Sequence, residues 1–521
     1  MVVFESGKRT ERKNRDALVL AIDVGTSGAR CMLFDASDGS RIATEHLEWD
    51  SFFPKSSWVE QDANLWWKTV CKTSRTVLAK SDVEPESIQG VSVTNQRETI
   101  VPVDEDGKPL HNAIVWQDRR TRKECDEIQK KLGGKTVYGI TGLAIDPYFS
   151  LPKILWLRKN APDAFRHAHK FCLVNDFVTH KLCGRFVTDH SNASRTMLFD
   201  IRKRDWSARI CDSFGIDESL LCEPVQSGIE VGRVTHDAAL ECGLAQGTPV
   251  VSGGGDQQCA ALGVGAVVEG RVKCTTGTGT FMLAASEKPR LADRRLLCSC
   301  HAVPDKWVIE ASMFTTGSVL KWFRDNVSEV RDYAAIDKLA EGAPAGSGGV
   351  LVVPHWMGAG APYWDPSARG IIAGLTLGHT RRHLLRAAME GVAFETRKNA
   401  EIMGKALGRR ISEVRVSGGA AKSRVWNGIM SDVLGIPLIV TKEPEATALG
   451  AAILAASGCG IHGSVISACD AMVKDKGKVV PNRKNGRIYD RIYGVHSKLY
   501  DAMKDARIWA DLEEFQSLGK R

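Results

Sequence analysis

Long apolar segments are missing from this sequence of 521 residues. No run approaches the roughly 20 apolar residues that a membrane-spanning helix needs. The opening stretch, MVVFESGKRTERKNRDA, is charged and lacks the apolar centre of a secretion signal. The sequence therefore predicts no membrane insertion, no export and a cytoplasmic location.

Paired cysteine motifs are also missing. The 14 cysteines are scattered without CxxC spacing, and only Cys298 and Cys300 form a CxC. Free thiols in a reducing cytosol explain this pattern more simply than a zinc site or a disulfide scaffold. The net charge of +8 is small for this length, and the basic residues are spread out. We therefore expect no nucleic-acid partner, although a mild positive balance suits an anionic substrate.

Two short patterns of strand, turn and strand stand about half a chain apart. LVLAID (18–23), VGTSG (24–28) and ARCMLFD (29–35) read as a β-hairpin with a Gly/Thr/Ser turn. GRVKCTT (270–276), GTG (277–279) and TFMLAAS (280–286) repeat the pattern. Because 521 residues are too many for one core, the two hairpins predict a duplicated architecture with two large domains.

Strands and helices alternate through both halves, which indicates an α/β fold. The expected strands are 87–95, 247–255, 348–356 and the start of 414–435. The expected helices are 149–161, the end of 168–184, 256–266, 379–407 and the end of 414–435. We place the domain boundary after the helix at 256–266. The prediction is a tail at 1–16, an N-terminal domain at 17–265, a C-terminal domain at 266–505 and a tail at 506–521.

Several turn residues have the chemistry of a phosphate site. Asp23 ends a strand before Thr26 and Ser27, so its carboxylate can hold Mg²⁺ while turn amides and hydroxyls face phosphate oxygens. Gly277 to Gly279 can bring backbone close to an anion from the other half. Taken singly, a turn aspartate that bonds its own backbone and an ordinary hairpin turn explain these residues as well.

Asp256 follows three glycines and begins a predicted helix, where it is either a helix cap or a general base for a hydroxyl acceptor. Arg97 and Glu98 follow a strand, and together they can bind a polyhydroxy ligand or form a surface ion pair. Trp116 and Tyr148 are candidates for an apolar wall, with core packing as the alternative.

Gly418 and Gly419 stand at a strand-to-helix junction, where the backbone can approach an adenine. No Lys-Ser/Thr of a P-loop follows them, and no GxGxxG signature of a dinucleotide site occurs in the right context.

Together, these segments resemble the FGGY family of carbohydrate kinases, and within it the glycerol kinase branch, over residues 17–505. YFSLPKILW (148–156) and GAPYWDPSARGIIAGLTLGHTRRHLLRAAMEGVAFETR (360–397) resemble the two family signatures. VTNQRET (93–99), NAIVWQDRRT (112–121), TGLAIDPYFS (141–150) and DHSNASRTMLFDI (189–201) are similar to the glycerol kinase branch. The resemblance implies two actin-like ATPase (ribonuclease H-like) domains around a catalytic cleft. It also implies an ATP- and Mg²⁺-dependent kinase for glycerol, in some relatives a homodimer or homotetramer.

Carried over position by position, the resemblance assigns roles to individual residues. Asp256 is expected as the catalytic base and Asp23 as the residue that organises Mg²⁺. The expected acceptor pocket consists of Arg97, Glu98, Trp116, Tyr148, Asp256, Gln257 and Phe281. The expected nucleotide-binding residues are Thr26, Ser27, Gly28, Arg30, Gly277, Thr278, Gly317, Lys321, Gly419 and Ser423.

The nucleotide side departs from the glycerol kinase pattern at three places. The second turn reads TGTGTF, GGAAKSRVW (418–426) resembles the xylulokinase branch, and Lys321 stands where glutamine is common. The glycine-rich loop that binds fructose 1,6-bisphosphate in some bacterial members is not visible before Gly247. Two alternatives stay open: a kinase for another polyol or a ketopentose, and a non-catalytic actin-like nucleotide-binding protein. The presence of both Asp23 and Asp256 argues against the second alternative.

Overall fold

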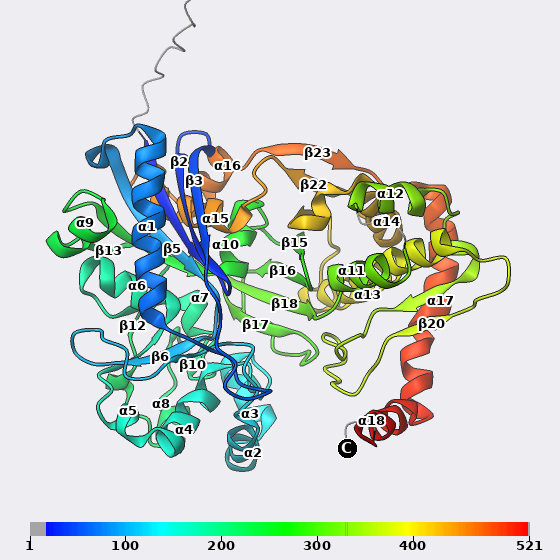
Figure 1. Cartoon of the computed structure of the whole chain (residues 1–521), viewed down its shortest axis with the longest axis horizontal. Coiled ribbons are helices and arrows are strands. Elements are labelled where there is room, and N and C mark those ends of the chain that lie inside the picture. The colour runs from blue at the N-terminus through cyan, green and yellow to red at the C-terminus, as the bar shows by residue number, and fades with distance from the viewer. Residues whose placement is uncertain (1–16, 329, 331, 519–521) are drawn as a thin grey trace, which may run out of the picture.

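Two large mixed sheets stand side by side in the computed structural model, with helices packed around and between them (Figure 1). The structure describes residues 17–328, 330 and 332–518, so the tail expected at 1–16 lies outside the described residues. Among the described residues, no helix is long and apolar enough to cross a membrane.

The first sheet has six strands in the order β13-β14-β5-β1-β2-β3. β1 pairs antiparallel with β2 and parallel with β5, which in turn runs parallel to β14. Alternate residues of β1 enter two different hydrophobic clusters, as the two-residue period of a strand requires. The strands are β1 Leu18–Val24, β2 Gly28–Asp35, β3 Ser40–Glu48, β5 Ile88–Asn95, β13 Glu230–Arg233 and β14 Pro249–Gly255.

The second sheet repeats this arrangement and adds one strand at its edge. Its order is β17-β18-β16-β15-β21-β22-β23, with the hairpin β15-β16 at the position of β1-β2. β21 and β22 are parallel like β5 and β14, and β23 is antiparallel like β13. The duplicated architecture expected from the two hairpins is therefore confirmed. The strands are β15 Arg271–Thr276, β16 Thr280–Ser286, β17 Leu297–Cys300, β18 Trp307–Met313, β21 Glu413–Ser417, β22 Leu438–Thr441 and β23 Asp475–Val479.

Helices cover both faces of the first sheet. On one face lie α1 Ala63–Ser81, α6 Val174–Cys183 and α9 His236–Cys242. On the other lie α10 Asp256–Gly263, α15 Ala446–Gly458 and α16 Val465–Met472. α10 contacts β14 of the first sheet and also β15 and β16 of the second. This helix is therefore the layer shared by the two halves.

The crossing of α10 and α15 depends on glycine. A Cβ on Gly263 would lie 1.9 Å from the carbonyl oxygen of Ala446, and one on Gly450 would lie 1.9 Å from that of Cys259. Only residues without a side chain permit so close an approach. α15 also packs on β1, β5 and β14, although it comes late in the chain. The second half of the sequence thus contributes a helix to the first layer, and the boundary after residue 265 stays a prediction.

α13 Arg381–Leu407, the long helix expected at 379–407, packs against the second sheet at β18. The other helices of this half are α11 Gly317–Asn326, α12 Tyr333–Glu341, α14 Arg424–Leu434, α17 Arg483–Asp505 and α18 Ile508–Leu518. α18 lies where a tail was expected at 506–521, so part of that segment is helical. Trp509 is buried beside Tyr500, so apolar packing holds the start of α18 against the fold.

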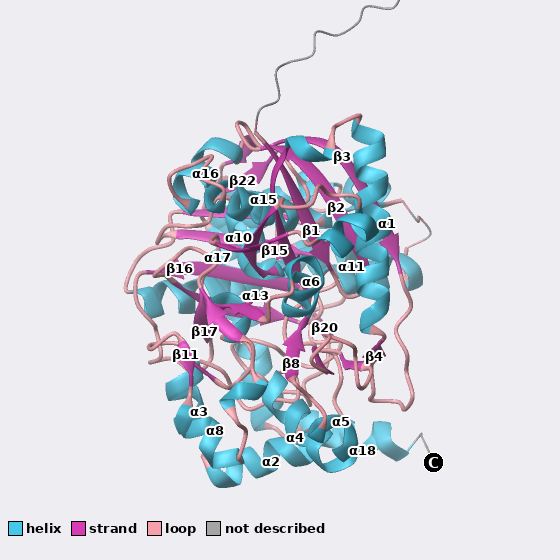
Figure 2. Ribbon diagram, turned by 90° about the vertical axis from the view of Figure 1, so that its left-hand side faces the viewer, coloured by secondary structure: helices cyan, strands magenta, loops and turns pink. Residues whose placement is uncertain are grey.

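A smaller lobe extends from the first sheet and lies at the lower end of both views (Figures 1 and 2). It contains a four-stranded sheet of β4 Glu60–Gln61, β7 Ala113–Ile114, β6 Ile100–Val103 and β8 Lys170–Leu173. Its helices are α2 Arg122–Lys131, α3 Gly134–Thr141, α4 Ser150–Asn160, α5 Pro162–Arg166 and α8 Ala208–Phe214. The short helix α7 His190–Ala193 instead contacts β14 of the first sheet and β17 of the second. Three strand pairs complete the fold: β9 Val187–Asp189 with β12 Glu223–Val225, β10 Phe199–Asp200 with β11 Asp205–Trp206, and β19 Leu351–Val353 with β20 Ile371–Ala373.

The strand expected at 348–356 is shorter than predicted. β19 covers only Leu351–Val353, and Pro354, which has no N–H to donate to a ladder, follows it directly. The other expected strands and helices are present, with bounds that shift by a few residues.

Candidate active site

Three parallel strands of the first sheet end side by side. Val24 of β1 pairs with Asn95 of β5, and Asn95 pairs with Gly255 of β14. The residues around these ends are therefore neighbours, and the amide of Gln96 donates to the carbonyl of Val24 at 2.8 Å. Ligands of open α/β sheets bind at such carboxyl ends.

Asp256 begins α10 but does not occupy its cap position. The cap residue is Gly255, and Asp256 is the first helical residue. Its Oδ1 accepts the Gln257 amide at 2.7 Å and lies 3.3 Å from Nε of Arg97, while Oδ2 accepts from Nε2 of Gln257 at 3.1 Å. The side chain is 32% exposed. A carboxylate in this position is held by neighbours yet open to a ligand.

Asp23 has few cations to balance its charge. Burial, followed by the nearby carboxylate of Asp256, raises the pKa of Asp23 to about 7, and Arg30 only partly opposes this shift. Arg30 itself also forms an ion pair with Glu445. A buried carboxylate with so little countercharge suits a divalent cation. The described residues contain no group of three side chains that could hold a metal, but Mg²⁺ commonly uses one or two carboxylates together with substrate phosphates.

Arg97 and Glu98 are buried rather than exposed, at 3% and 1%. Glu98 has a φ of 64°, a left-handed conformation that costs a non-glycine residue about 1–3 kcal/mol and is typical of functional sites. Two side chains stabilise this turn: Ser150 Oγ and Lys153 Nζ donate to the Glu98 carbonyl at 3.1 and 3.0 Å. A surface ion pair, the alternative considered for this dipeptide, is therefore wrong.

An aromatic wall stands beside this pair. The rings of Trp116 and Tyr148 meet edge to face with centroids 5.5 Å apart. Nε1 of Trp116 donates to the Thr26 hydroxyl at 2.9 Å, so the wall is joined to the first hairpin turn. Phe281 lies on β16 of the second sheet, and its carbonyl accepts from Nζ of Lys273 at 3.3 Å. Lys273 also bonds the side chain of Gln257.

Four buried charged residues in this region were not identified from the sequence: Lys153, Arg195, Lys273 and Glu310. Burial lowers the pKa of Lys153 to about 7 and that of Lys273 to about 8. Glu310 interrupts the otherwise apolar or small-residue strand WVIEASM, and Lys273 lies between two buried apolar residues in RVKCTT. A lone charge inside a buried strand was the available signal, because such charges are rare unless they are paired.

The second hairpin turn is tied to the start of α11. The Thr278 carbonyl accepts the amides of Thr316 and Ser318 at 3.0 and 3.2 Å. A Cβ on Gly317 would lie 2.1 Å from the Gly277 carbonyl oxygen. Gly277, Thr278 and Gly317, predicted separately, are thus brought together.

The remaining predicted nucleotide residues lie in different settings. Gly28 packs under β3, where a Cβ would lie 2.4 Å from the Leu47 carbonyl oxygen, and Ser27 is exposed in the first turn. Gly419 has open space beside its backbone, since a Cβ there meets nothing within 4 Å. Ser423 caps α14 by accepting the Trp426 amide at 2.9 Å, and Lys321 is exposed on α11.

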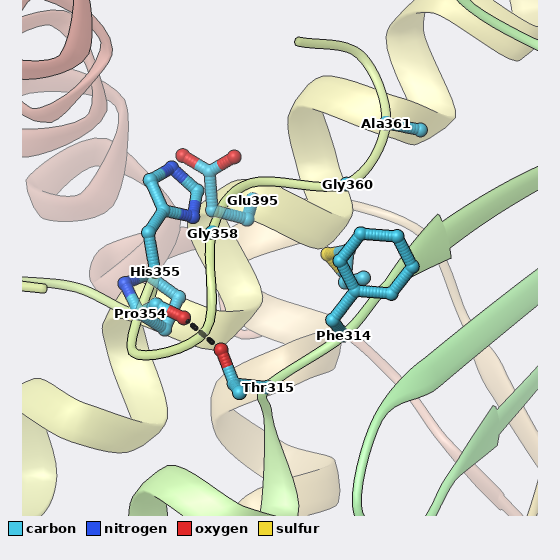
Figure 3. Close-up of a pocket in the computed structure, with 9 residues that line it drawn as sticks. Phe314, Thr315, Pro354, His355, Gly358, Gly360, Ala361 and Glu395 are labelled. Atoms are coloured by element: carbon cyan, nitrogen blue, oxygen red, sulfur yellow. Dashed lines mark hydrogen bonds between the residues drawn. The ribbon is translucent and has the colours of Figure 1, made fainter. Parts of the chain in front are cut away.

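A small cavity lies beyond the end of β18 (Figure 3). Thr315 donates to the Pro354 carbonyl at 2.5 Å, and the side chains of His355 and Glu395 lie next to each other on its wall. None of the predicted site residues lines it.

Two duplicated sheets with hairpin turns, strand-end carboxylates and a shared helix define a two-domain phosphotransferase of the actin-like, ribonuclease H-like class. Residues 18–263 match the N-terminal domain, and residues 272–459 the C-terminal domain, of the FGGY family of carbohydrate kinases. The chain belongs to this family.

Curated relatives agree with this assignment. A glycerol kinase of Thermococcus gammatolerans is 40% identical over 444 residues, which cover 84% of this chain and 88% of that protein. A glycerol kinase of Chromobacterium violaceum is 37% identical over 507 residues, which cover 95% and 99%.

Solved structures also match nearly the whole chain. Plasmodium falciparum glycerol kinase with ADP has a TM-score of 0.85 and 28% identity, with 92% of this chain and 98% of that chain covered. Xylulose kinase from Rhodospirillum rubrum has a TM-score of 0.87 and 28% identity, with 94% and 99% covered.

Proposed function

We propose that this protein transfers the γ-phosphoryl group of ATP to glycerol and forms sn-glycerol 3-phosphate. The observation that carries the proposal is the buried Arg97–Glu98 pair, with Nε of Arg97 3.3 Å from Oδ1 of Asp256. A short polyol bound to that pair presents its remaining hydroxyl to the carboxylate. The glycerol kinases at 37–40% identity support the same acceptor.

Asp256 is the general base of this proposal. Its carboxylate takes the proton of the terminal hydroxyl, the hydroxyl oxygen bonds to the γ-phosphorus, and the bond to the bridging oxygen breaks to release ADP. Gln257 donates to Oδ2 at 3.1 Å and the Gln257 amide to Oδ1 at 2.7 Å, so the carboxylate has a fixed orientation. Such positioning is the main contribution a protein makes to phosphoryl transfer.

The acceptor pocket discriminates by hydrogen bonds and by size. Arg97 donates to two hydroxyls and Glu98 accepts from them, while Trp116, Tyr148 and Phe281 cover the carbon chain. A substrate that leaves these buried polar groups unpaired loses about 10⁴-fold or more in efficiency.

Thr26, Ser27, Gly28 and Arg30 contact the phosphates from the first hairpin in this proposal. Gly277, Thr278, Gly317, Lys321, Gly419 and Ser423 contact the nucleotide from the second half. Asp23 would organise Mg²⁺, which neutralises phosphate charge when it is bound. A cytoplasmic location and a division into domains at 17–265 and 266–505 complete the proposal.

The test is ADP release by the purified protein with glycerol, erythritol, xylulose, ribulose, gluconate or no acceptor. We expect glycerol to give the highest kcat/KM by a wide margin. A pentulose or a tetritol with a higher kcat/KM would overturn the proposal. Nucleotide binding without release in the presence of any acceptor would instead favour a non-catalytic protein.

A further inference from the structure

We propose that Glu310, on β18 of the second sheet, is a positioning residue for the acceptor, because its carboxylate fixes which N–H groups of Arg97 face the ligand. The inference rests on the proposed function, in which Arg97 binds the acceptor. It assigns a role to a residue that touches neither substrate.

Glu310 and Arg97 are joined by two parallel hydrogen bonds. Nη1 of Arg97 donates to Oε2 at 2.8 Å and Nη2 donates to Oε1 at 3.1 Å. Glu310 is fully buried, and Oε1 also accepts from the Ser312 hydroxyl at 3.1 Å. This fork geometry fixes the plane of the guanidinium as well as its position.

The two bonds to Glu310 leave some N–H groups of Arg97 available to a ligand. A guanidinium has five N–H groups. Glu310 takes one from each terminal nitrogen, and Gln258 Oε1 takes the second from Nη1 at 3.2 Å. One N–H of Nη2 and the N–H of Nε remain. Nε faces the reaction side, 3.3 Å from Asp256 and 3.9 Å from Glu98.

Glu310 belongs to a larger group of buried charged side chains. Arg195 donates from Nε to Glu98 at 2.6 Å, and its Nη1 lies 3.5 Å from Oε2 of Glu310. Burial opposes ionisation, yet Arg195 and Arg97 together lower the pKa of Glu310 to about 2. Two arginines and two glutamates therefore form one buried network, in which Glu310 is the member that comes from the second sheet.

The network joins segments that are distant in the sequence. Glu310 and Arg97 are 213 residues apart. Arg97 follows β5 of the first sheet and Arg195 follows α7, so acceptor recognition requires β18 to stay docked on the first half. A purely stabilising ion pair would need the same contacts, and the experiment must separate these two roles.

The test compares E310Q with E390Q. Glu390 is 1% exposed and pairs with Arg386 at 2.8 Å inside α13, away from the site, so it is a matched buried pair. We expect E310Q to raise the glycerol KM about ten- to hundredfold and to change the ATP KM less than about twofold. We expect both E310Q and E390Q to lower the melting temperature. Only E390Q should leave the glycerol KM unchanged.

A third variant, E310D, keeps the charge but is one methylene too short for both bonds to Arg97. We expect a glycerol KM between those of the wild type and E310Q. An unchanged glycerol KM in E310Q, or in E310D where E310Q does not fold, would overturn the inference. Failure of the wild type to phosphorylate glycerol would instead overturn the proposed function.

Discussion

The two sheets share one strand order but end in different chemistry. At the ends of β1, β5 and β14, the first sheet presents Asp23, Arg97 with Glu98, and Asp256. At the corresponding ends of β15 and β21, the second sheet presents glycine turns at 277–279 and 418–419. The same strand order thus presents charged side chains at the ends of the first sheet and exposed glycine backbone at the ends of the second.

This difference fits the two ligands of a carbohydrate kinase. A polyol differs from its competitors only in the number and position of hydroxyls, and buried ionic donors and acceptors can read such differences. A nucleotide needs close approach of backbone amides to phosphates and room for a flat ring, which glycine provides. We therefore expect charge substitutions to act on the first side and added Cβ atoms to act on the second.

The largest expected effect is that of D256N. Asparagine keeps the shape of the side chain but cannot take the hydroxyl proton, so we expect kcat to fall about 10²–10⁴-fold. ATP affinity measured by calorimetry should stay near that of the wild type. Near-normal turnover would show that Asp256 is a structural residue at the start of α10.

R97A should impair the use of glycerol without changing the affinity for ATP. The substitution removes the hydroxyl donor and leaves Glu310 without its bidentate partner, so we expect kcat/KM for glycerol to fall at least about 10²-fold. Loss of one partner of a buried pair should also reduce the free energy of unfolding by about 3–5 kcal/mol. ATP affinity, measured on the folded fraction, should be spared, and an equal loss for both ligands would contradict the comparison.

G317A should act on the nucleotide side alone. The new Cβ would lie 2.1 Å from the Gly277 carbonyl oxygen, so the second hairpin turn must move. We expect the ATP KM to rise about tenfold at an unchanged glycerol KM, since a shift near 1 Å is enough to lose aligned contacts. G428A is the control, because a Cβ on Gly428 in α14 meets nothing within 4 Å and alanine favours a helix.

The smallest expected effect is that of W116F, which should change the KM for glycerol and the KM for ATP. Phenylalanine keeps the packing against Tyr148 but loses the bond from Nε1 to the Thr26 hydroxyl. One neutral hydrogen bond contributes about 0.5–1.5 kcal/mol, so a two- to tenfold change is expected. Steady-state kinetics should show both KM values raised. A change in glycerol KM alone would show that the contact of Trp116 with the first hairpin turn does not affect ATP binding.

Local signals in the sequence were enough for the hairpins and for the strand-to-helix junctions. The apolar runs at 18–23 and 270–276 end in Gly/Thr turns, and turn chemistry of this kind acts over a few residues. Residue-level roles for Arg97, Trp116 and Asp256 came from resemblance to a family rather than from spacing.

Long-range packing was out of reach of the sequence. Glu310 meets Arg97 across 213 residues, and α15 returns from the end of the chain to the first sheet. The fork on Arg97 and the α10–α15 contact depend on three-dimensional docking that no local pattern encodes. The start of α18 was missed for the same reason, since Trp509 is buried in a cluster with Tyr500, Ala359 and Ala368, which precede it in the chain.

The glycine contact between α10 and α15 has a consequence for both sheets. Gly263 closes the helix that Asp256 opens, about 10 Å away at 1.5 Å per residue. A methyl group added at Gly263 acts as a spacer, since it would lie 1.9 Å from the Ala446 carbonyl oxygen and force α15 away from α10. Because α10 contacts β14 of the first sheet and β15 and β16 of the second, the substitution would disturb the helix that both sheets share. Gly263 is therefore a position where one added methyl group is expected to alter packing around both sheets.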